Sequence, residues 1–155
     1  MRKCNLKIKK FLAILGIATL TSLSVTPTSI LAATPTVTDT TLTLSNYFTK
    51  LTPRVNSLYG MPATSSVNAT TVFGTKHAIS DVTFNVTVSR GSDPFYLIVT
   101  SPQGQKISKL IGTSGVVKFP EFINLQAKGT WYITVQTTGT VSTVSTSMRV
   151  DYKYK

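Results

Sequence analysis

The sequence predicts an all-β protein, an antiparallel β-sandwich or jelly roll of about seven to eight strands preceded by a helical signal peptide. From Thr34 onward, Thr, Ser and Val dominate the composition and runs of helix-forming residues are almost absent. Several segments alternate strictly between apolar and polar residues, which is the pattern of a strand with one buried face. Gly, Pro and Asn separate these segments at short intervals, as in antiparallel sandwiches.

The middle of the chain gives the clearest strand predictions. Residues 81–88 alternate and place four apolar side chains on one face, namely Val82, Phe84, Val86 and Val88. Residues 94–100 are apolar at both parities, so we expect a central strand covered on both sides. The Ser-Pro-Gln-Gly sequence at residues 101–104 then predicts a type I turn, because Pro favours its second position and Gly its fourth.

The remaining strands are predicted from the same alternation and from the turn residues between them. In residues 129–135 the alternation of apolar and polar residues places Trp131, Ile133 and Val135 on one side of the strand. The C-terminal residues alternate in the same way. The further predicted strands are 41–44, 71–79, 105–111, 116–119 and the C-terminal stretch containing Met148, Val150, Tyr152 and Tyr154.

The amino end has the three successive regions of a secretory signal peptide, residues 1–33. Its first ten residues hold five positive charges and no acid, and an apolar run, Phe11–Ala18, follows. This run is shorter than the roughly 20 residues of a membrane span. Small residues up to Ala33 predict cleavage there, so we expect a secreted protein, with a retained anchor as the alternative. The long basic region and Thr-rich tail resemble signal peptides of Gram-positive bacteria.

Cleavage would leave a flexible leader, residues 34–40, and one β-sandwich domain, residues 41–155. It would remove Cys4, the only cysteine, so the secreted domain would have neither a disulfide nor a lipid anchor. It would also remove five of sixteen basic residues and no acid, which lowers the net charge from +11 to 11 − 5 = +6. Such a charge favours anionic surfaces, although solubility alone also explains it. No basic cluster interleaved with aromatic residues predicts a specific nucleic-acid site.

Residues 46–68 do not follow the alternation and predict a short helix or a long loop across one end of the sandwich. Long loops on rigid β scaffolds often carry binding, so this segment is the first candidate for a partner surface. Alternatively it is a plug, in which Tyr47, Phe48 and Leu51 cover an open end of the core. The candidate partner residues are Tyr47, Phe48, Arg54, Tyr59 and Met61.

The side chains needed for catalysis or metal binding are few. His77 is the only histidine, no Gly-x-Ser-x-Gly elbow is present, and no glycine-rich phosphate loop occurs. The five acids are far apart in sequence, which disfavours a calcium cage or a catalytic carboxylate pair. We therefore expect no enzyme, no cofactor and no metal site. The acids are Asp39, Asp81, Asp93, Glu121 and Asp151.

Two motifs carry a resemblance to a known group of domains. They are Pro-Phe-Tyr-Leu-Ile-Val-Thr-Ser-Pro-Gln-Gly at residues 94–104 and Lys-Gly-Thr-Trp-Tyr-Ile-Thr-Val at residues 128–135. Over residues 80–155 the chain resembles the jelly-roll domains that accompany secreted subtilisin-like proteases, namely proprotein convertase P domains and bacterial pre-peptidase C-terminal domains. The resemblance implies a jelly roll that assists a protease, but the acids that hold calcium in many of those domains are missing here.

Together these observations predict a secreted, non-catalytic binding or accessory module that acts at the cell envelope or on another exported protein. An anionic cell-wall polymer or an exported protein, including a protease, is the expected partner. The alternative is a structural, self-associating protein of the extracellular surface or matrix, because edge strands can pair between copies. An antagonist directed at competing cells is a third possibility.

Overall fold

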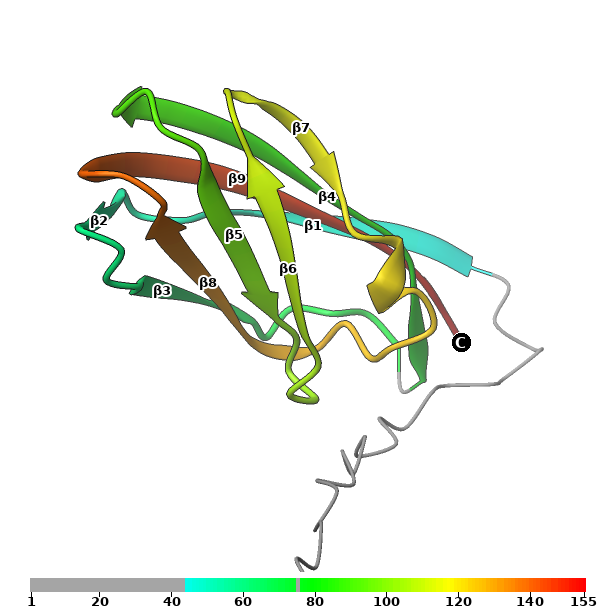
Figure 1. Ribbon diagram of the computed structural model, residues 1–155. Coiled ribbons are helices and arrows are strands. Elements are labelled where there is room, and N and C mark those ends of the chain that lie inside the picture. The colour runs from blue at the N-terminus through cyan, green and yellow to red at the C-terminus, as the bar shows by residue number, and fades with distance from the viewer. Residues whose placement is uncertain (1–43, 75) are drawn as a thin grey trace, which may run out of the picture. The chain divides into compact units, whose positions relative to one another are not determined.

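The computed structural model describes residues 44–74 and 76–155, which all lie within one compact unit (Figure 1). The predicted signal peptide, residues 1–33, the predicted leader, residues 34–40, and the first three residues of the strand predicted at 41–44 lie outside the described residues. Within the described ranges no helix is long and apolar enough to cross a membrane.

The described residues form strands and one short 3-10 helix, as expected for a chain rich in β-branched residues. The elements are β1 (Leu44–Leu51), β2 (Val55–Leu58), β3 (Ala63–Ala69), β4 (His77–Arg90), β5 (Phe95–Thr100), β6 (Lys106–Ile111), β7 (Gly115–Lys118), η1 (Pro120–Phe122), β8 (Gly129–Thr137) and β9 (Val141–Tyr154).

The strands pack as two antiparallel sheets, which confirms the predicted sandwich (Figure 1). The β9 sheet has the order β1-β9-β4-β7 with β2 also paired to β9, and the β8 sheet has the order β3-β8-β5-β6. Because β1 and β2 pair with successive parts of β9, they act as one interrupted strand. When β1 and β2 are counted as one strand, the first of the eight strands pairs with the last. The second then pairs with the seventh, the third with the sixth and the fourth with the fifth, which is the topology of a jelly roll.

The core lies between the sheets and is built from the inward residues of both. Trp131 is fully buried, and its Nε1 donates a 3.2 Å hydrogen bond to the carbonyl of Ala127. A chain of aromatic contacts crosses the core, with ring centroids 5.3 Å apart for Phe84 and Phe119 and 5.4 Å apart for Phe122 and Trp131. Such edge-to-face contacts add to the stabilisation from buried area.

Most of the predicted strands are confirmed, including the inward faces of residues 82–86 and 131–135. The turn at residues 101–104 is confirmed as well, because Gly104 N donates to the Ser101 carbonyl at 2.9 Å. The prediction that residues 94–100 are covered on both sides is wrong. Strand β5 is central in its sheet, but Tyr96 is 42% exposed, because a two-layer sandwich leaves one face of each sheet in solvent.

The expectation of a helix or long loop at residues 46–68 is also wrong, because this segment contains β1, β2 and β3. These strands lie at sheet edges, so they bury little surface, and polar residues such as Thr52 and Ser57 occupy buried positions. The apolar alternation is therefore weak there. The strand predicted over residues 71–79 is confirmed only for its last three residues, because residues 70–74 lie outside any strand and β4 begins at His77.

We predict that Trp131→Ala lowers the free energy of unfolding by about 3–5 kcal/mol, because it removes a fully buried indole and leaves a cavity. Urea denaturation of purified protein measures this loss. Tyr132→Ala is the matched control, since the neighbouring side chain is 48% exposed and its truncation should cost less than about 1 kcal/mol. If Trp131→Ala does not fold, Trp131→Phe should show a smaller loss in the free energy of unfolding. Equal losses from substitution at positions 131 and 132 would contradict the prediction.

Candidate functional site

The structure separates the five residues that the sequence proposed as a partner surface. Tyr47 lies on the outer face of β1, where the Arg149 guanidinium stacks 4.1 Å from its ring centroid. Phe48 faces inward and packs against the core near Tyr152, as the plug interpretation expected, whereas Leu51 is 76% exposed and covers nothing there. The segment is therefore neither a single loop surface nor a plug.

The other three candidate residues, Arg54, Tyr59 and Met61, gather at one end of the sandwich. There the β1–β2 connection, the β2–β3 turn and the loops after β4 and β8 lie together (Figure 1). We call this region the loop end. Tyr47 pairs with Asp151 and Leu58 with Val141, ten residues apart on β9, so Tyr47 lies roughly 30 Å from the loop end.

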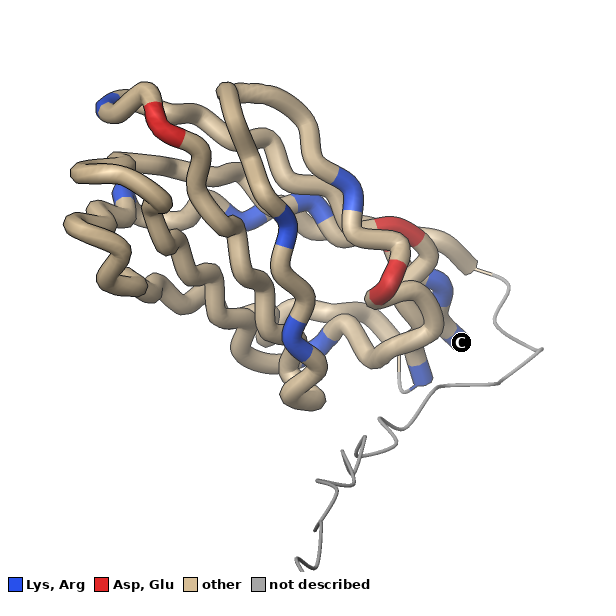
Figure 2. Tube along the Cα trace, in the orientation of Figure 1, with Lys and Arg blue, Asp and Glu red and all other residues tan. Residues whose placement is uncertain are grey.

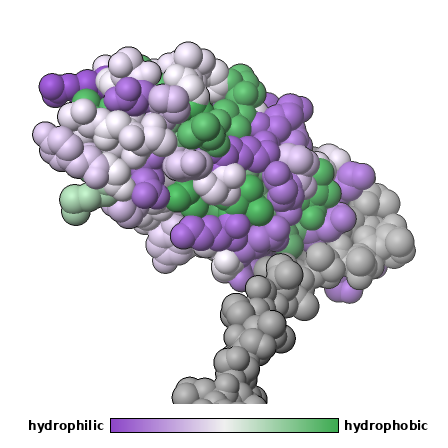
Figure 3. Space-filling model, in the orientation of Figure 1, coloured by the Kyte–Doolittle hydropathy of each residue, from purple (hydrophilic) through white to green (hydrophobic). Residues whose placement is uncertain are grey.

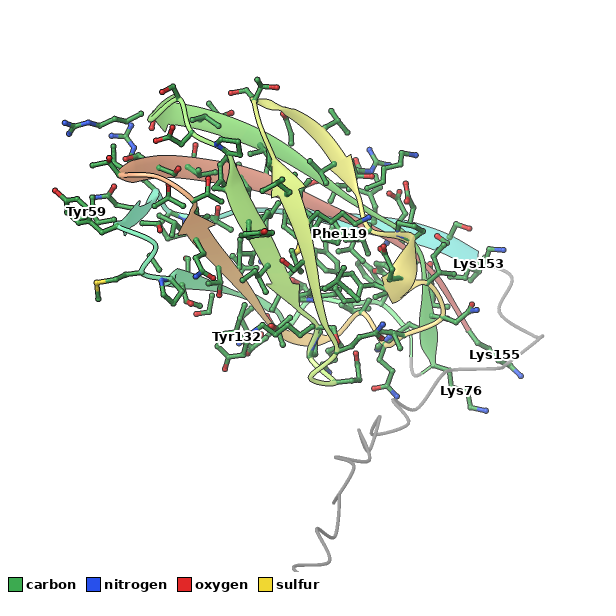
Figure 4. The ribbon with its side chains drawn as sticks, viewed as in Figure 1. Tyr59, Lys76, Phe119, Tyr132, Lys153 and Lys155 are labelled. Atoms are coloured by element: carbon green, nitrogen blue, oxygen red, sulfur yellow. The ribbon has the colours of Figure 1, made fainter. Side chains whose placement is uncertain are left out.

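The most exposed feature of the loop end is the tight β2–β3 turn at residues 58–61. Tyr59 and Gly60 have φ angles of +49° and +75°, as the two central residues of a type I′ turn require. An aromatic residue rarely adopts this left-handed conformation. The Tyr59 side chain is nevertheless 77% exposed and Met61 is 69% exposed (Figure 4). No burial of the ring compensates the strain of the backbone.

Hydrogen bonds from strand β8 and from the β8–β9 loop hold the backbone of this turn. Tyr59 N donates to the Thr140 carbonyl at 2.9 Å, and Gln136 Nε2 donates to the Gly60 carbonyl at 2.9 Å. The buried Ser57 hydroxyl donates to the carbonyl of the last turn residue at 2.7 Å and accepts from the Thr137 amide at 2.9 Å. The backbone of Tyr59 is therefore held in its position by hydrogen bonds, which lowers the cost of ordering this residue when a partner binds.

A pocket of about 460 Å³ lies beside the turn, on the outer face of the β9 sheet. Asn56, Thr143 and Arg90 are cross-strand neighbours in its floor, and the Thr143 hydroxyl donates to Asn56 Oδ1 at 2.8 Å. Arg54 and Ser89 complete the lining. Neither arginine forms an ion pair in the described part of the chain, where the paired bases are Lys109, Lys118 and Arg149. The pocket therefore carries two uncompensated positive charges.

Sequence reasoning selected Arg54 but missed the rest of this pocket: Asn56, Ser89, Arg90 and Thr143. One signal was available. The alternation of residues 82, 84, 86 and 88 continues to residue 90, so it assigns a charged arginine to the buried face. A charge at such a position indicates that the strand contains a bulge, which re-aims the side chain.

A second exposed apolar area covers the outer face of the β8 sheet. Figure 3 shows apolar surface interspersed with hydrophilic surface on the side where β5 and β6 face the viewer in Figure 1. Tyr96, Leu110 and Tyr132 contribute exposed fractions of 42%, 58% and 48%. None of these side chains lines the pocket described above, which gathers the charged and polar side chains of the loop end.

The remaining charges are distributed over the domain (Figure 2), and three of its other basic residues are paired with acids. Lys109 Nζ lies 3.1 Å from Glu121 Oε1 and 4.8 Å from the Phe119 ring centroid, and it donates a 2.6 Å hydrogen bond to the Lys118 carbonyl, which links β6 to β7. Asp81 is paired with Lys118 at 3.6 Å. Asp151 receives a bidentate contact from Arg149, which raises the pKa of that guanidinium.

Three further lysines, Lys76, Lys153 and Lys155, lie at the end of the domain opposite Tyr59 (Figure 4). Within the described residues, no three His, Cys, Asp or Glu side chains gather into a potential metal site.

His77 lies in the interior, with only 7% of its surface exposed. Its Nδ1 accepts a 3.2 Å hydrogen bond from the Ala127 amide, and its ring meets Tyr152 edge-on. Desolvation lowers the pKa of His77 below the usual 6.5, and the charge of Lys128 lowers this pKa further. The imidazole is therefore neutral in the folded state and has a structural contact on Nδ1.

No family model matches the sequence, and no curated protein matches it either. Among solved structures, the crystal structure of FlhE is similar, with a TM-score of 0.52 and 13% sequence identity. The similarity covers 71% of this chain and 96% of that chain. At this identity the likeness concerns the fold alone.

We predict that the free energy of unfolding falls as the pH drops below about 6.5, the unfolded pKa of histidine. In that range His77 is protonated in the unfolded chain but remains neutral in the folded protein. This stability contribution is complete above the unfolded pKa and declines until the pH reaches the lowered folded pKa. Urea midpoints between about pH 5 and pH 8 measure it. His77→Asn, which keeps an acceptor near Nδ1, should flatten this part of the profile, and an unchanged profile would refute the assignment.

We predict that Tyr59→Asn raises the free energy of unfolding by up to about 1 kcal/mol, because Asn tolerates positive φ better than an aromatic residue. Thermal or urea denaturation measures the change. Tyr132→Asn is the control, because that residue lies within strand β8 and should not gain stability. A loss of stability in Tyr59→Asn would contradict the prediction, because it would show that the exposed ring stabilises the fold by more than the unfavourable φ of Tyr59 destabilises it.

Proposed function

We propose that this protein is a secreted, non-catalytic binding or accessory module that acts at the cell envelope or on another exported protein. The observation that carries the proposal is Tyr59, an exposed aromatic residue fixed in a strained backbone conformation on a rigid scaffold. Strained, exposed residues persist where function retains them, and rigid aromatic side chains often dominate binding energy. The two uncompensated arginines beside the turn favour an anionic partner.

The environments of the polar side chains support a non-catalytic role. His77 is buried, and its Nδ1 is engaged by a backbone amide. Asp81, Glu121 and Asp151 each form an ion pair with a basic side chain. None of these acids lines the pocket at the loop end, so the pocket offers no carboxylate for acid–base catalysis.

An anionic wall polymer is the first partner class, because residues 34–155 carry a net charge of +6 after removal of residues 1–33. An exported protease is the second partner class, and it rests on the resemblance of residues 80–155 to protease-associated jelly-roll domains. A pull-down from spent growth medium distinguishes the two classes, because recovery of a protease would favour the accessory role.

The self-association alternative is favoured by one observation, the free edge of β3. This seven-residue strand forms the edge of the β8 sheet and contains no charged residue and no proline. Lys50, Lys106 and Lys118 lie on the edge strands β1, β6 and β7, where lysine disfavours strand addition, and the remaining edge strand, β2, is only four residues long. Light scattering at increasing concentration tests this alternative, and a strict monomer would refute it.

We predict that the full chain, expressed with a C-terminal tag in a Gram-positive host, is recovered from the culture medium with Thr34 as its first residue. N-terminal sequencing of the recovered protein checks this. Replacing Leu12 and Leu15 with Arg should retain the protein in the cell, because the apolar run is interrupted. Equal recovery of this variant, or an intact N-terminus in the medium, would contradict the proposed signal peptide.

We predict that purified protein sediments with isolated cell walls and is released as NaCl rises from about 50 mM to about 500 mM, because screening weakens charge attraction. Tyr59→Ala should weaken this binding by about tenfold, as expected for an aromatic hot spot. Tyr132→Ala removes a half-exposed tyrosine from the β8 sheet and should leave binding unchanged. Salt-independent sedimentation, or equal losses in both variants, would refute the role of the loop end.

A further inference from the structure

We propose that the pocket between Arg54 and Arg90 binds a phosphate group, and that its source is the phosphodiester backbone of an anionic polyol polymer of the envelope. This inference rests on the proposed function and identifies the ligand of the loop end. Its starting point is the placement of two arginines on one face of the β9 sheet, where simple strand alternation would not put them.

Arg90 reaches the outer face because β4 contains a bulge. Along β4 the even-numbered residues Val82, Phe84 and Val86 face the core, so an unbroken strand would also turn residue 90 inward. The register shifts by one residue between Val88, which pairs with Val144, and Arg90, which pairs with Thr143. The extra residue reverses the parity and turns Arg90 outward.

Arg54 reaches the same face through a second irregularity, on the strand that flanks β9 on its other side. Leu51 pairs with Ser147 and Val55 pairs with Val144, so three residues of the β1–β2 connection lie opposite two of β9. The extra residue reverses the parity again, because Phe48 faces inward in β1 whereas Asn56 faces outward in β2. Two bulges at the same level of the sheet therefore direct two arginines to either side of Thr143.

The lining fits a phosphate group better than a carboxylate. One guanidinium fork satisfies both oxygens of a carboxylate, whereas two forks beside neutral donors suit the larger, tetrahedral oxygen set of a phosphate group. Asn56 Oδ1 accepts from the Thr143 hydroxyl, which leaves the two amide hydrogens of Asn56 as donors. Ser89 adds a hydroxyl to the rim of the pocket. No acid is among the residues that line the pocket.

The surroundings of the pocket favour a polyol polymer over a lipid surface. The outer face of the β9 sheet continues from the pocket as paired uncharged polar residues, Thr87 with Ser145 and Asn85 with Ser147. These side chains can hydrogen-bond the hydroxyl groups of a polyol next to the phosphate. The pocket volume of about 460 Å³ lies in the range of small-ligand sites and admits a phosphate with its neighbouring polyol unit.

Isothermal titration calorimetry tests the proposal with the purified full chain and four probes: inorganic phosphate, poly(glycerol phosphate), polyglutamate and phosphatidylglycerol vesicles. Arg54→Gln/Arg90→Gln removes the two forks, and Arg54→Lys/Arg90→Lys keeps the charge but not the fork. Lys153→Gln/Lys155→Gln is the matched control, because it removes the same charge at the opposite end of the domain (Figure 4). Unchanged urea midpoints establish that all variants are folded.

We expect poly(glycerol phosphate) to bind more tightly than polyglutamate, and Arg54→Gln/Arg90→Gln to weaken this binding by at least about tenfold. The control variant Lys153→Gln/Lys155→Gln should weaken the binding of poly(glycerol phosphate) by less than about threefold. The Arg54→Lys/Arg90→Lys variant should lose affinity although its charge is unchanged. In amide NMR spectra, inorganic phosphate should shift Asn56, Ser89 and Thr143.

Three outcomes would overturn the inference. Equal losses of affinity in Arg54→Gln/Arg90→Gln and in Lys153→Gln/Lys155→Gln would show that charge attraction is spread over the domain. Equal affinity for polyglutamate would remove the preference for phosphate, and binding to vesicles without binding to the polymer would identify a lipid headgroup as the source. In the first two cases salt-dependent binding to cell walls survives, so the failure of this inference remains distinct from a failure of the proposed function.

Discussion

The antiparallel pairing of β9 with β1, β2 and β4 is the interaction on which the rest of the domain depends. Its fourteen residues lie at the centre of one sheet, and its inward side chains, from Val144 to Tyr152, cover the core from that side. The strands on its two sides, β1 with β2 on one side and β4 on the other, pair with β9 along its length. Each bulge in these strands is therefore defined by its register with β9. The Arg54–Arg90 pocket exists because both neighbours carry one extra residue at the same level.

The loop end combines rigidity with local strain. The β4–β5 and β8–β9 loops are tied together by Thr138, which bonds the Pro94 carbonyl through both its amide and its hydroxyl. Gly139 packs so closely on Asp93 that a β-carbon could not be accommodated without movement. This support holds the β2–β3 turn in place although Tyr59 has an unfavourable φ. Without disulfides in the domain, hydrogen bonding and tight loop packing supply the rigidity that presentation of an exposed aromatic residue requires.

The distribution of charge explains why a modest net charge can still produce a local site. Lys109, Lys118 and Arg149 are paired with acids, and Lys109 and Arg149 also lie over aromatic rings. Arg54 and Arg90 have no such acidic partner in the described chain, and both line the pocket at the loop end. Long-range attraction and local recognition then act on the same anion, the first through net charge and the second through geometry.

The sequence by itself determined the all-β sandwich, its middle strands and the turn at residues 101–104, because alternation and turn chemistry are local properties of the chain. It failed at residues 46–68, where edge strands bury too little apolar surface to show a period. It brought Arg54, Tyr59 and Met61 to attention by composition alone. Only the tertiary structure decided that these three lie together, that Phe48 belongs to the core, and that Arg90 joins Arg54, because register and bulges are set by pairing between distant strands.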